Sequence, residues 1–425
     1  MVIVRLVFTA VALLIAWPNP VLAASPSERD VINTYADIAV AKYEDSLSMA
    51  RKLNAAIGKL LGEPNQHNLD AARAAWVAAR VPYMQTEVYR FGNAVVDDWE
   101  GRVNAWPLDE GMIDYVAGEY GTESEINELY VANIVASKQL SLSGRKIDAS
   151  QISRALLIDT LHEAGGVEAN VATGYHAIEF LLWGQDLNGT EPGAGNRPPT
   201  DFDISACTGG NCERRAQYLR VAAEILIEDL SWIIKQWQAG GSARDTLLSS
   251  GEGQGITAIF NGMGSLTYGE LAGERMKLGL ILHEPEEEHD CFSDNTHNSH
   301  YFNVIGIRNI YLASYTRLNG EVVSGPSPSD LVKAADAETD RKLRAALEAS
   351  ETEFAALKKR AETVEAYDQM LAEGNEAGNA AITKAIDALL AQTKDIEAAI
   401  AALNLKLVEF EGSDSLDDPD NIGKF

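Results

Sequence analysis

Residues 173–184 read TGYHAIEFLLWG, an apolar stretch that contains one imidazole and one carboxylate. On a helix, His176 and Glu179 stand three residues apart and therefore share one face. Gly174 lies one turn before Ile178 and leaves open space beside the backbone. An ionisable pair inside an apolar helix costs free energy unless a metal ion, a partner side chain or water satisfies it. The stretch therefore predicts a buried helix that carries either a ligand site or a satisfied buried pair.

A second helix, expected between residues 68 and 91, carries a face of mixed aromatic and charged side chains. Pro82 lies inside this helix and predicts a kink. The face suits either a partner for the first stretch or a surface stripe with an exposed ion pair. Its members follow one another at helical spacing, and they are Trp76, Arg80, Tyr83 and Glu87.

A third unusual stretch, residues 286–297, reads EEEHDCFSDNTH and mixes imidazoles with carboxylates. Runs of charge are usually solvated faces, but this run ends in Phe, Asn and Thr, which suits a folded loop beside a site. His289, Asp290 and Asp294 are therefore candidates for contact with a metal or a substrate. A purely structural network is the alternative.

These three stretches resemble one protein family. The pattern Gly-x-His-x-x-Glu at 174–179, followed by FLLWG, resembles the signature of the imelysin family, a group of secreted bacterial proteins first classed as peptidases. The Trp, Arg, Tyr and Glu helix is similar to the family helix that faces this motif. Residues 287–297 resemble a hallmark of its iron-regulated protein A branch. The resemblance implies two helical halves with the motif near the cleft between them, and a role in iron uptake or iron response.

The rest of the chain predicts an all-α fold of two up-and-down helical bundles with long loops, because no alternating strand pattern of useful length appears. A Gly-, Pro- and Asn-rich stretch, residues 184–212, is expected to separate an N-terminal bundle (24–200) from a C-terminal bundle (201–410). Residues 411–425 are expected to form a flexible, acidic tail. Helices are expected within residues 25–61, 123–140, 150–164, 213–238, 329–349, 352–371 and 379–405, and connections at 92–112 and 251–264.

Composition and the N-terminus indicate an exported protein. The chain has 425 residues and a net charge of -28, which argues against nucleic acid or an anionic membrane surface as a partner. Residues 1–23 read as a secretory signal peptide, and no later stretch is apolar enough to span a bilayer. We therefore expect a periplasmic protein, and peripheral association with the outer membrane stays open. Cys207 and Cys212 predict a small disulfide in that oxidising space, with the start of a zinc site as the alternative.

The favoured function is metal binding in the cleft. His176 and Glu179 would supply a nitrogen and an oxygen ligand, and the resemblance adds Glu87 as the third. Arg80 would pair with a ligand carboxylate and fix its orientation without binding the metal, with Trp76, Tyr83 and Gly174 beside it. Further candidates in the cleft are His289, Asp290 and Asp294. The spacing does not choose between a divalent and a ferric ion; iron ranks above zinc because of the resemblance, which also implies an iron-transport or cell-envelope partner.

Two alternatives remain. Metal-dependent hydrolysis of peptides follows from the family name, but His-Glu-x-x-His, the usual zinc peptidase helix, is absent because Phe180 stands where the second His is required. A metal-free cleft could instead bind a peptide, a glycan or a cell-envelope ligand through Trp99, Trp106 and Trp183.

Overall fold

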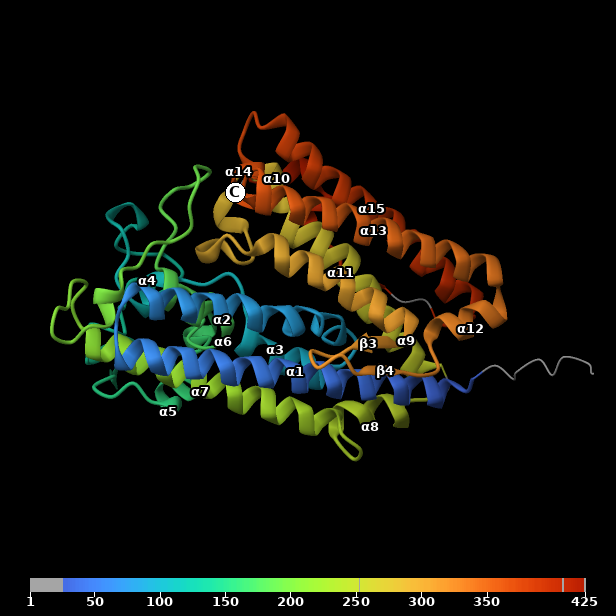
Figure 1. Ribbon diagram of the computed structural model, residues 1–425, viewed down its shortest axis with the longest axis horizontal. Helices are drawn as coiled ribbons and strands as arrows, with labels where there is room; N and C mark the ends of the chain where they lie inside the picture. The colour runs from blue at the N-terminus through green and yellow to red at the C-terminus, as the bar shows by residue number, and fades with distance from the viewer. Residues whose placement is uncertain (1–25, 252, 407–408, 424–425) are drawn as a thin grey trace, which may run out of the picture.

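The computed structural model describes residues 26–251, 253–406 and 409–423 and forms two layers of long helices (Figure 1). The all-α prediction is confirmed, because helices dominate and the two sheets in the described residues have two short strands each. The predicted signal peptide, residues 1–23, lies outside the described residues. Among the described residues, none of the helices combines the length and the apolar character that a bilayer crossing requires.

The first layer is built on the hairpin of α1 and α2. Ser27 caps α1 by accepting a hydrogen bond from the N–H of Asp30, and Asn65 caps α2 by accepting one from the N–H of Asn68. Pro82 lies in the last turn of α2, where the helix ends two residues later. α7 packs along α1, and α6 is enclosed by α2, α3 and α7. The helices of this layer are α1 (Glu28–Gly62), α2 (Gln66–Met84), α3 (Ala94–Asn104), α6 (Gly174–Trp183), α7 (Cys212–Trp237) and α8 (Ser242–Ser249).

The second layer is built on the long helices α13 and α15, which pack against each other. α11 packs on α13 and also on α2, so it joins the two layers (Figure 1). A π-helical segment, η6 (Leu266–Lys277), continues directly from α9. The helices of this layer are α9 (Gln254–Ser265), α10 (Leu278–Leu282), α11 (Thr296–Leu312), α12 (Pro328–Ala335), α13 (Ala337–Thr363), α14 (Tyr367–Leu371) and α15 (Glu376–Ala402).

The hydrophobic core has two clusters. The larger cluster contains side chains from both layers, and its first and last members in the sequence are Val31 and Ile400. The smaller one, from Leu271 to Leu389, belongs to the second layer. α7 begins after the loop at 184–212 and still packs on α1, so this loop joins helices of one layer. The predicted boundary at residue 200 stays a prediction.

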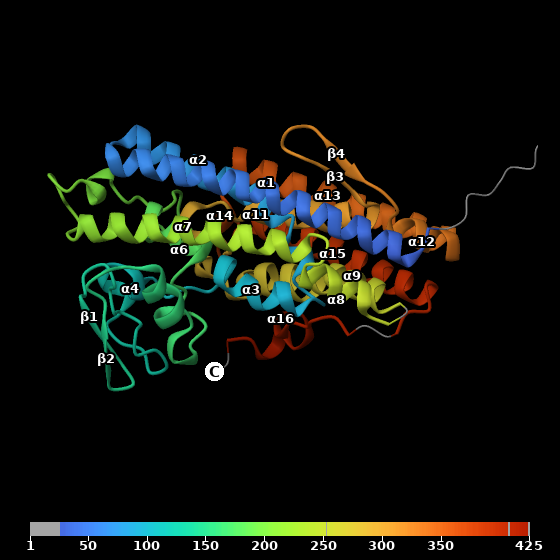
Figure 2. The same ribbon diagram turned by 90° about the horizontal axis from the view of Figure 1, so that it is seen from below.

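An irregular lobe stands beside the first layer between α3 and α6 (Figure 2). The helix expected at 123–140 does not form, because these residues make turns that lead into the hairpin of β1 and β2. The helix expected at 150–164 is reduced to α5 and a π-helical turn, Leu157–Leu161. The elements of the lobe are α4 (Glu110–Ile113), β1 (Gln139–Leu142), β2 (Arg145–Asp148) and α5 (Arg154–Leu156).

Three further segments differ from the expectation. Residues 92–112, expected as a loop, contain α3, and the Gly-rich stretch 251–264 contains α9. A second hairpin, β3 (Ser314–Thr316) and β4 (Val322–Ser324), follows α11.

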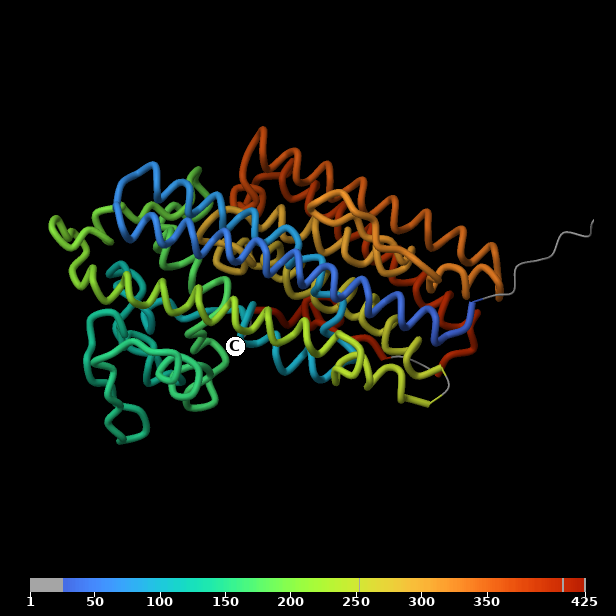
Figure 3. Tube along the Cα trace, turned by 60° about the horizontal axis from the view of Figure 1, so that its bottom comes forward, coloured from blue at the N-terminus to red at the C-terminus, as the bar shows by residue number. Residues whose placement is uncertain are grey.

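The C-terminal segment returns toward the middle of the molecule (Figure 3). It includes α16 (Asp414–Asp417), and Ser415 donates a hydrogen bond to the Gly273 carbonyl in η6 (3.0 Å).

Candidate metal centre

The centre begins where α6 starts against the end of α3. Gly174 has a φ of +87°, and a Cβ atom at this position would lie 2.5 Å from the carbonyl oxygen of Val103. The Thr173 hydroxyl donates a hydrogen bond to the carbonyl of Arg102 (2.8 Å). Only glycine allows this combination of backbone angle and close approach. The contact fixes the first turn of α6, and with it His176, beside the C-terminal end of α3.

His176 is fully buried, and its two ring nitrogens have different surroundings. Nδ1 lies 3.0 Å from Oε2 of Glu179, one turn further along α6. Nε2 has no hydrogen-bond partner among the described residues. Burial, together with the positive charges of Arg80 and Arg275, holds the pKa of His176 well below its ordinary value, so the ring is neutral. A neutral imidazole that gives one N–H to a carboxylate and keeps the other nitrogen unpaired is the arrangement of a metal-ligating histidine.

Two further donors face His176 from the segment before α11. His176, His289 and Asp290 each place a possible ligand atom within 4.8 Å of the others, and all three side chains are buried. The two imidazole rings have centroids 4.7 Å apart and meet edge to face. Burial and the charge of Arg275 also hold the pKa of His289 well below its ordinary value. Two neutral imidazoles and one carboxylate fit a transition-metal ion.

Asp290 is held in place by a dense set of donors. Arg80 donates to its Oδ1 (2.7 Å), and Asn295 and Ser299 donate to its Oδ2 (2.8 and 2.5 Å). Burial raises the pKa of Asp290, but the charge of Arg80 together with the hydrogen bonds from Ser299 and Asn295 outweighs burial, so the pKa lies below its ordinary value. Asp290 is therefore ionised and fixed in orientation.

Arg80 is itself caged by aromatic rings. Its guanidinium lies 5.4, 5.8 and 5.1 Å from the ring centroids of Trp76, Tyr83 and Tyr175. The Trp76 indole donates to the carbonyl of Tyr175 (2.9 Å), which ties α2 to α6. Trp76, Arg80 and Tyr83 of the predicted face thus point at α6, and Arg80 reaches Asp290 through this cage. Glu87, the fourth member, lies beyond the end of α2, which stops at Met84 and not at the expected residue 91.

Glu179 and Glu87, expected as ligands, occupy different places. Glu179 is tied to His176 and accepts hydrogen bonds from the hydroxyl and the N–H of Ser293 (2.6 and 3.1 Å). Glu87 pairs with Arg275 (2.7 Å) because this cation reaches it from η6. Neither carboxylate belongs to the group of three possible donors, which contains His176 of the three expected ligands, so the expected roles of Glu179 and Glu87 as ligands stay predictions.

Asn104 links these groups. Its amide nitrogen lies 3.2 Å from Nε2 of His289 and 3.4 Å from Oε2 of Glu87, and its amide oxygen accepts from Arg80. Asn104, Ser293 and Arg275 were not predicted from the sequence. Ser293 lies inside the stretch 286–297, which was predicted to be functional, and Asn104 lies in the expected connection 92–112, whereas no local pattern distinguishes Arg275.

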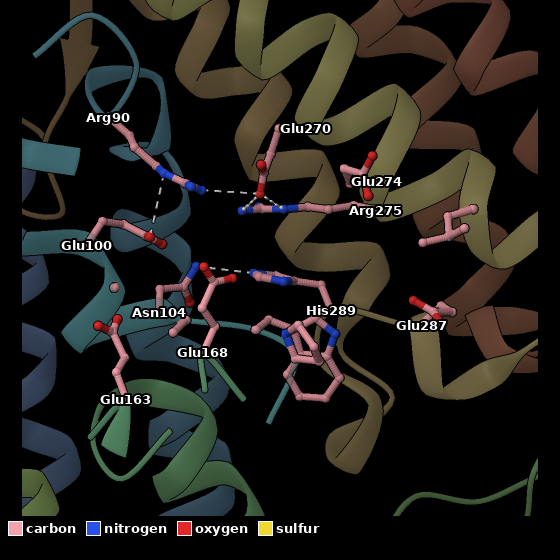
Figure 4. A pocket seen from close by; sticks show the side chains of 15 residues that line it. Arg90, Glu100, Asn104, Glu163, Glu168, Glu270, Glu274, Arg275, Glu287 and His289 are labelled. Carbon is pink, nitrogen blue, oxygen red and sulfur yellow. Dashed lines mark hydrogen bonds and ion pairs between the residues drawn. The ribbon is translucent and has the colours of Figure 1, made fainter. Parts of the chain in front are cut away.

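A pocket of about 550 Å³ opens beside the centre (Figure 4). His289, Asn104 and Trp106 lie on its wall, and the Trp106 ring stands 5.0 Å from the His176 ring. Trp99 and Trp183, by contrast, pack inside the core. Carboxylates dominate the rest of the lining, and they are Glu100, Glu163, Glu168, Glu270, Glu274 and Glu287. The approach to His289 is therefore polar and acidic.

The remaining predicted site residues lie elsewhere. Cys207 and Cys212 form a disulfide at the start of α7, with Cα atoms 5.9 Å apart. Cys291 is buried and unpaired among the described cysteines. Asp294 belongs to a separate group of carboxylates with Asp186 and Asp368.

Known proteins resemble this chain in sequence. Iron-regulated protein A of Synechococcus elongatus is 23% identical over 284 residues, a match that covers 64% of this chain. The same match spans 61% of the length of that protein.

Solved structures resemble it in fold. A protein described as an iron-regulated protein A precursor, from Parabacteroides distasonis, has a TM-score of 0.62 at 18% identity, over 90% of this chain and 97% of that one. An imelysin-like protein from Psychrobacter arcticum has a TM-score of 0.53 at 15% identity, over 91% and 100%. The imelysin family model matches residues 39–396. Since this match covers far more than half of the sequence, the chain belongs to the imelysin family.

Proposed function

We propose that this protein binds a transition-metal ion through His176, His289 and Asp290, with iron as the favoured ion and an iron-uptake or iron-response role. The observation that carries the proposal is the buried Nε2 of His176, which lacks a partner in the described chain while Nδ1 is held by Glu179. Two imidazoles and one carboxylate are the donors of many non-haem iron(II) centres. The name of the cyanobacterial relative supports iron over zinc.

The surrounding residues support capture of a cation. Glu179 would keep His176 in the tautomer that leaves Nε2 available, and Arg80 would hold Asp290 in the ligating orientation. The acidic lining of the pocket, with Glu168 and Glu274 among its members, would attract cations toward His289. In this role the ion is cargo, and the protein contributes orientation and electrostatic attraction.

Location and partners form part of the same proposal. The predicted signal peptide and the disulfide between Cys207 and Cys212 both suit the periplasm. A periplasmic iron-binding protein would exchange its cargo with an iron-transport component of the cell envelope. Peripheral association with the outer membrane would bring it near such a partner.

Anaerobic titration with iron(II), followed by elemental analysis, tests the proposal. His176→Ala should lose tight binding while its helical circular dichroism stays unchanged. His67→Ala is the matched control, because His67 is exposed on α2, and it should bind like the wild type. Equal metal content in His176→Ala and in the wild type would contradict the proposal that His176 binds the metal.

Metal-dependent peptide hydrolysis is the second candidate, because the family name and the donor set both suit it. Zinc peptidases also use two His and one carboxylate with a bound water. Hydrolysis needs a general base near that water. Glu179 is engaged by Ser293 and Glu87 by Arg275, which favours binding over hydrolysis. Incubation of casein with the zinc-loaded protein decides between the two, and cleavage that disappears in His176→Ala would establish the peptidase.

A further inference from the structure

A second group of acids lies apart from the candidate metal centre. Asp186, Asp294 and Asp368 each place a carboxylate oxygen within 4.8 Å of the others. Asp186 follows α6, Asp294 precedes α11, and Asp368 lies in the first turn of α14. Segments that are far apart in the chain therefore bring three like charges together, at a Coulomb cost that a folded protein does not carry without compensation.

Two buried carboxylates in this region lack partners. Asp368 is 1% exposed, and neither of its side-chain oxygens has a hydrogen-bond partner in residues 26–251, 253–406 and 409–423. Glu288 is also 1% exposed, and its Oε2 has no partner within the same ranges. A buried carboxylate without a hydrogen bond or a counter-charge costs several kcal/mol, at about the level of a lost ion-pair partner. Such a group either binds a proton or faces a cation.

The charges that act on these acids are negative. Burial and the neighbouring Asp368 and Asp186 raise the pKa of Asp294 to about 7. Burial raises the pKa of Asp368 to about 6, although the N–H of Gln369 acts in the opposite direction, and Asp186 and Glu365 raise it further. Burial raises the pKa of Glu288 well above its ordinary value, and the charges of Asp368 and Asp294 raise it further. None of the groups that dominate these three shifts is a Lys or an Arg.

We propose that Asp186, Asp294 and Asp368, with Glu288 beside them, bind one divalent cation of the calcium type. The donors are carboxylate oxygens, without imidazole or thiolate among them, and such a set selects a hard cation over iron or zinc. Ca²⁺ takes six to eight oxygen ligands in flexible geometry, which suits carboxylates that come from separate segments. Mg²⁺ demands near-ideal octahedral geometry and is usually held by only one or two carboxylates.

The position of this site gives it a structural consequence. Glu288 and Asp294 lie at the two ends of the segment that carries His289 and Asp290. A cation shared with Asp186 and Asp368 would fasten this segment to the end of α6 and to α14. The calcium ion would therefore order the loop that supplies two of the three donors of the metal centre.

Calorimetric titration of the full, chelator-treated protein with CaCl₂ tests the proposal. The wild type should show saturable binding of a single equivalent, and Ca²⁺ should raise its thermal midpoint. Asp368→Asn should weaken binding at least about tenfold. Glu373→Gln removes an exposed acid two residues beyond α14 and should bind like the wild type. Terbium bound at the site should luminesce when Tyr367, adjacent to Asp368, is excited.

Three outcomes would overturn the proposal: absence of saturable binding at millimolar Ca²⁺, wild-type affinity in Asp368→Asn, or a preference for Mg²⁺. If Asp368→Asn does not fold, Asp186→Asn takes its place, because Asp186 lies in a half-buried loop. His176→Ala should keep the calcium site. Loss of iron binding and loss of calcium binding can therefore be told apart.

Discussion

Substitution of Gly174 by alanine should misplace the first turn of α6. The left-handed backbone angle of +87° costs an L-residue about 1–2 kcal/mol. The new Cβ would also lie 2.5 Å from the Val103 carbonyl oxygen, well inside van der Waals contact and against rigid backbone. Overpacking of this kind costs about 1–3 kcal/mol. The free energy of unfolding should therefore fall by about 2–5 kcal/mol in total.

Urea unfolding followed by circular dichroism measures this loss. Gly58→Ala provides a matched control, because Gly58 lies in the interior of α1, is exposed, and has no atom within 4 Å of its Cβ position. Alanine there should raise the free energy of unfolding by about 0.5–1 kcal/mol through helix propensity. The same change of glycine to alanine should thus have opposite signs at the two positions.

The iron affinity of Gly174→Ala gives the second readout. A ligand must stay within about 0.5 Å of its productive position, so a displaced His176 should weaken iron binding at least tenfold. Gly58→Ala should leave the affinity unchanged. If Gly174→Ala is destabilised and still binds iron like the wild type, then the close packing of α6 on α3 does not position His176, and the reasoning is refuted.

Three further expectations follow from the same contacts. Glu179→Gln should weaken iron binding about 10–100-fold in the same titration, because the imidazole loses the carboxyl group that orients its Nδ1. Glu87→Gln should change the affinity by less than about threefold, yet lower the free energy of unfolding by about 1–3 kcal/mol, since Arg275 loses one of its two acidic partners. Burial raises the pKa of Glu100 and of Glu110 to about 7, so the folded state binds protons more tightly than the unfolded chain. Urea midpoints in chelator should therefore fall as pH rises from about 5 to 8, and Glu110→Gln should flatten this slope.

The sequence predicted the long helices well because their periodicity is local. α1, α7 and α15 follow from apolar residues at helical spacing bounded by capping residues and glycines, whereas α13 (Ala337–Thr363) runs through the break expected at residues 350–351. The irregular lobe was not predicted, since hairpins as short as β1 and β2 leave almost no alternating pattern. The segment of α9 was read as a connection because its glycines suggest a break. These glycines instead allow close approach, as at Gly262, where a Cβ atom would meet the Val88 carbonyl at 2.3 Å.

For the centre, the sequence identified residues but could not assign their partners. His176, His289 and Asp290 all stood out from local composition. Glu179 was expected as a ligand because it shares a helix face with His176, yet the same spacing places it against Nδ1 as a hydrogen-bond acceptor. Glu87 was expected as the third ligand, and this expectation required that no basic side chain pair with its carboxylate. Arg275 lies 188 residues away in the chain, and this pairing is a property of the tertiary structure.

The proposed metal binding would couple to the attachment of the two helix layers, because the candidate donors come from both. His176 lies on α6 in the first layer, and His289 and Asp290 precede α11 in the second. An ion that binds only the assembled state stabilises it by about 2.7 kcal/mol when its free concentration is a hundred times the dissociation constant. Separation of the layers at this point would divide the donor set and release the ion, and a bound ion would resist that separation by the same free energy. A partner that received the metal would therefore have to supply this free energy, either by holding the layers apart or by offering ligands that bind the ion more tightly.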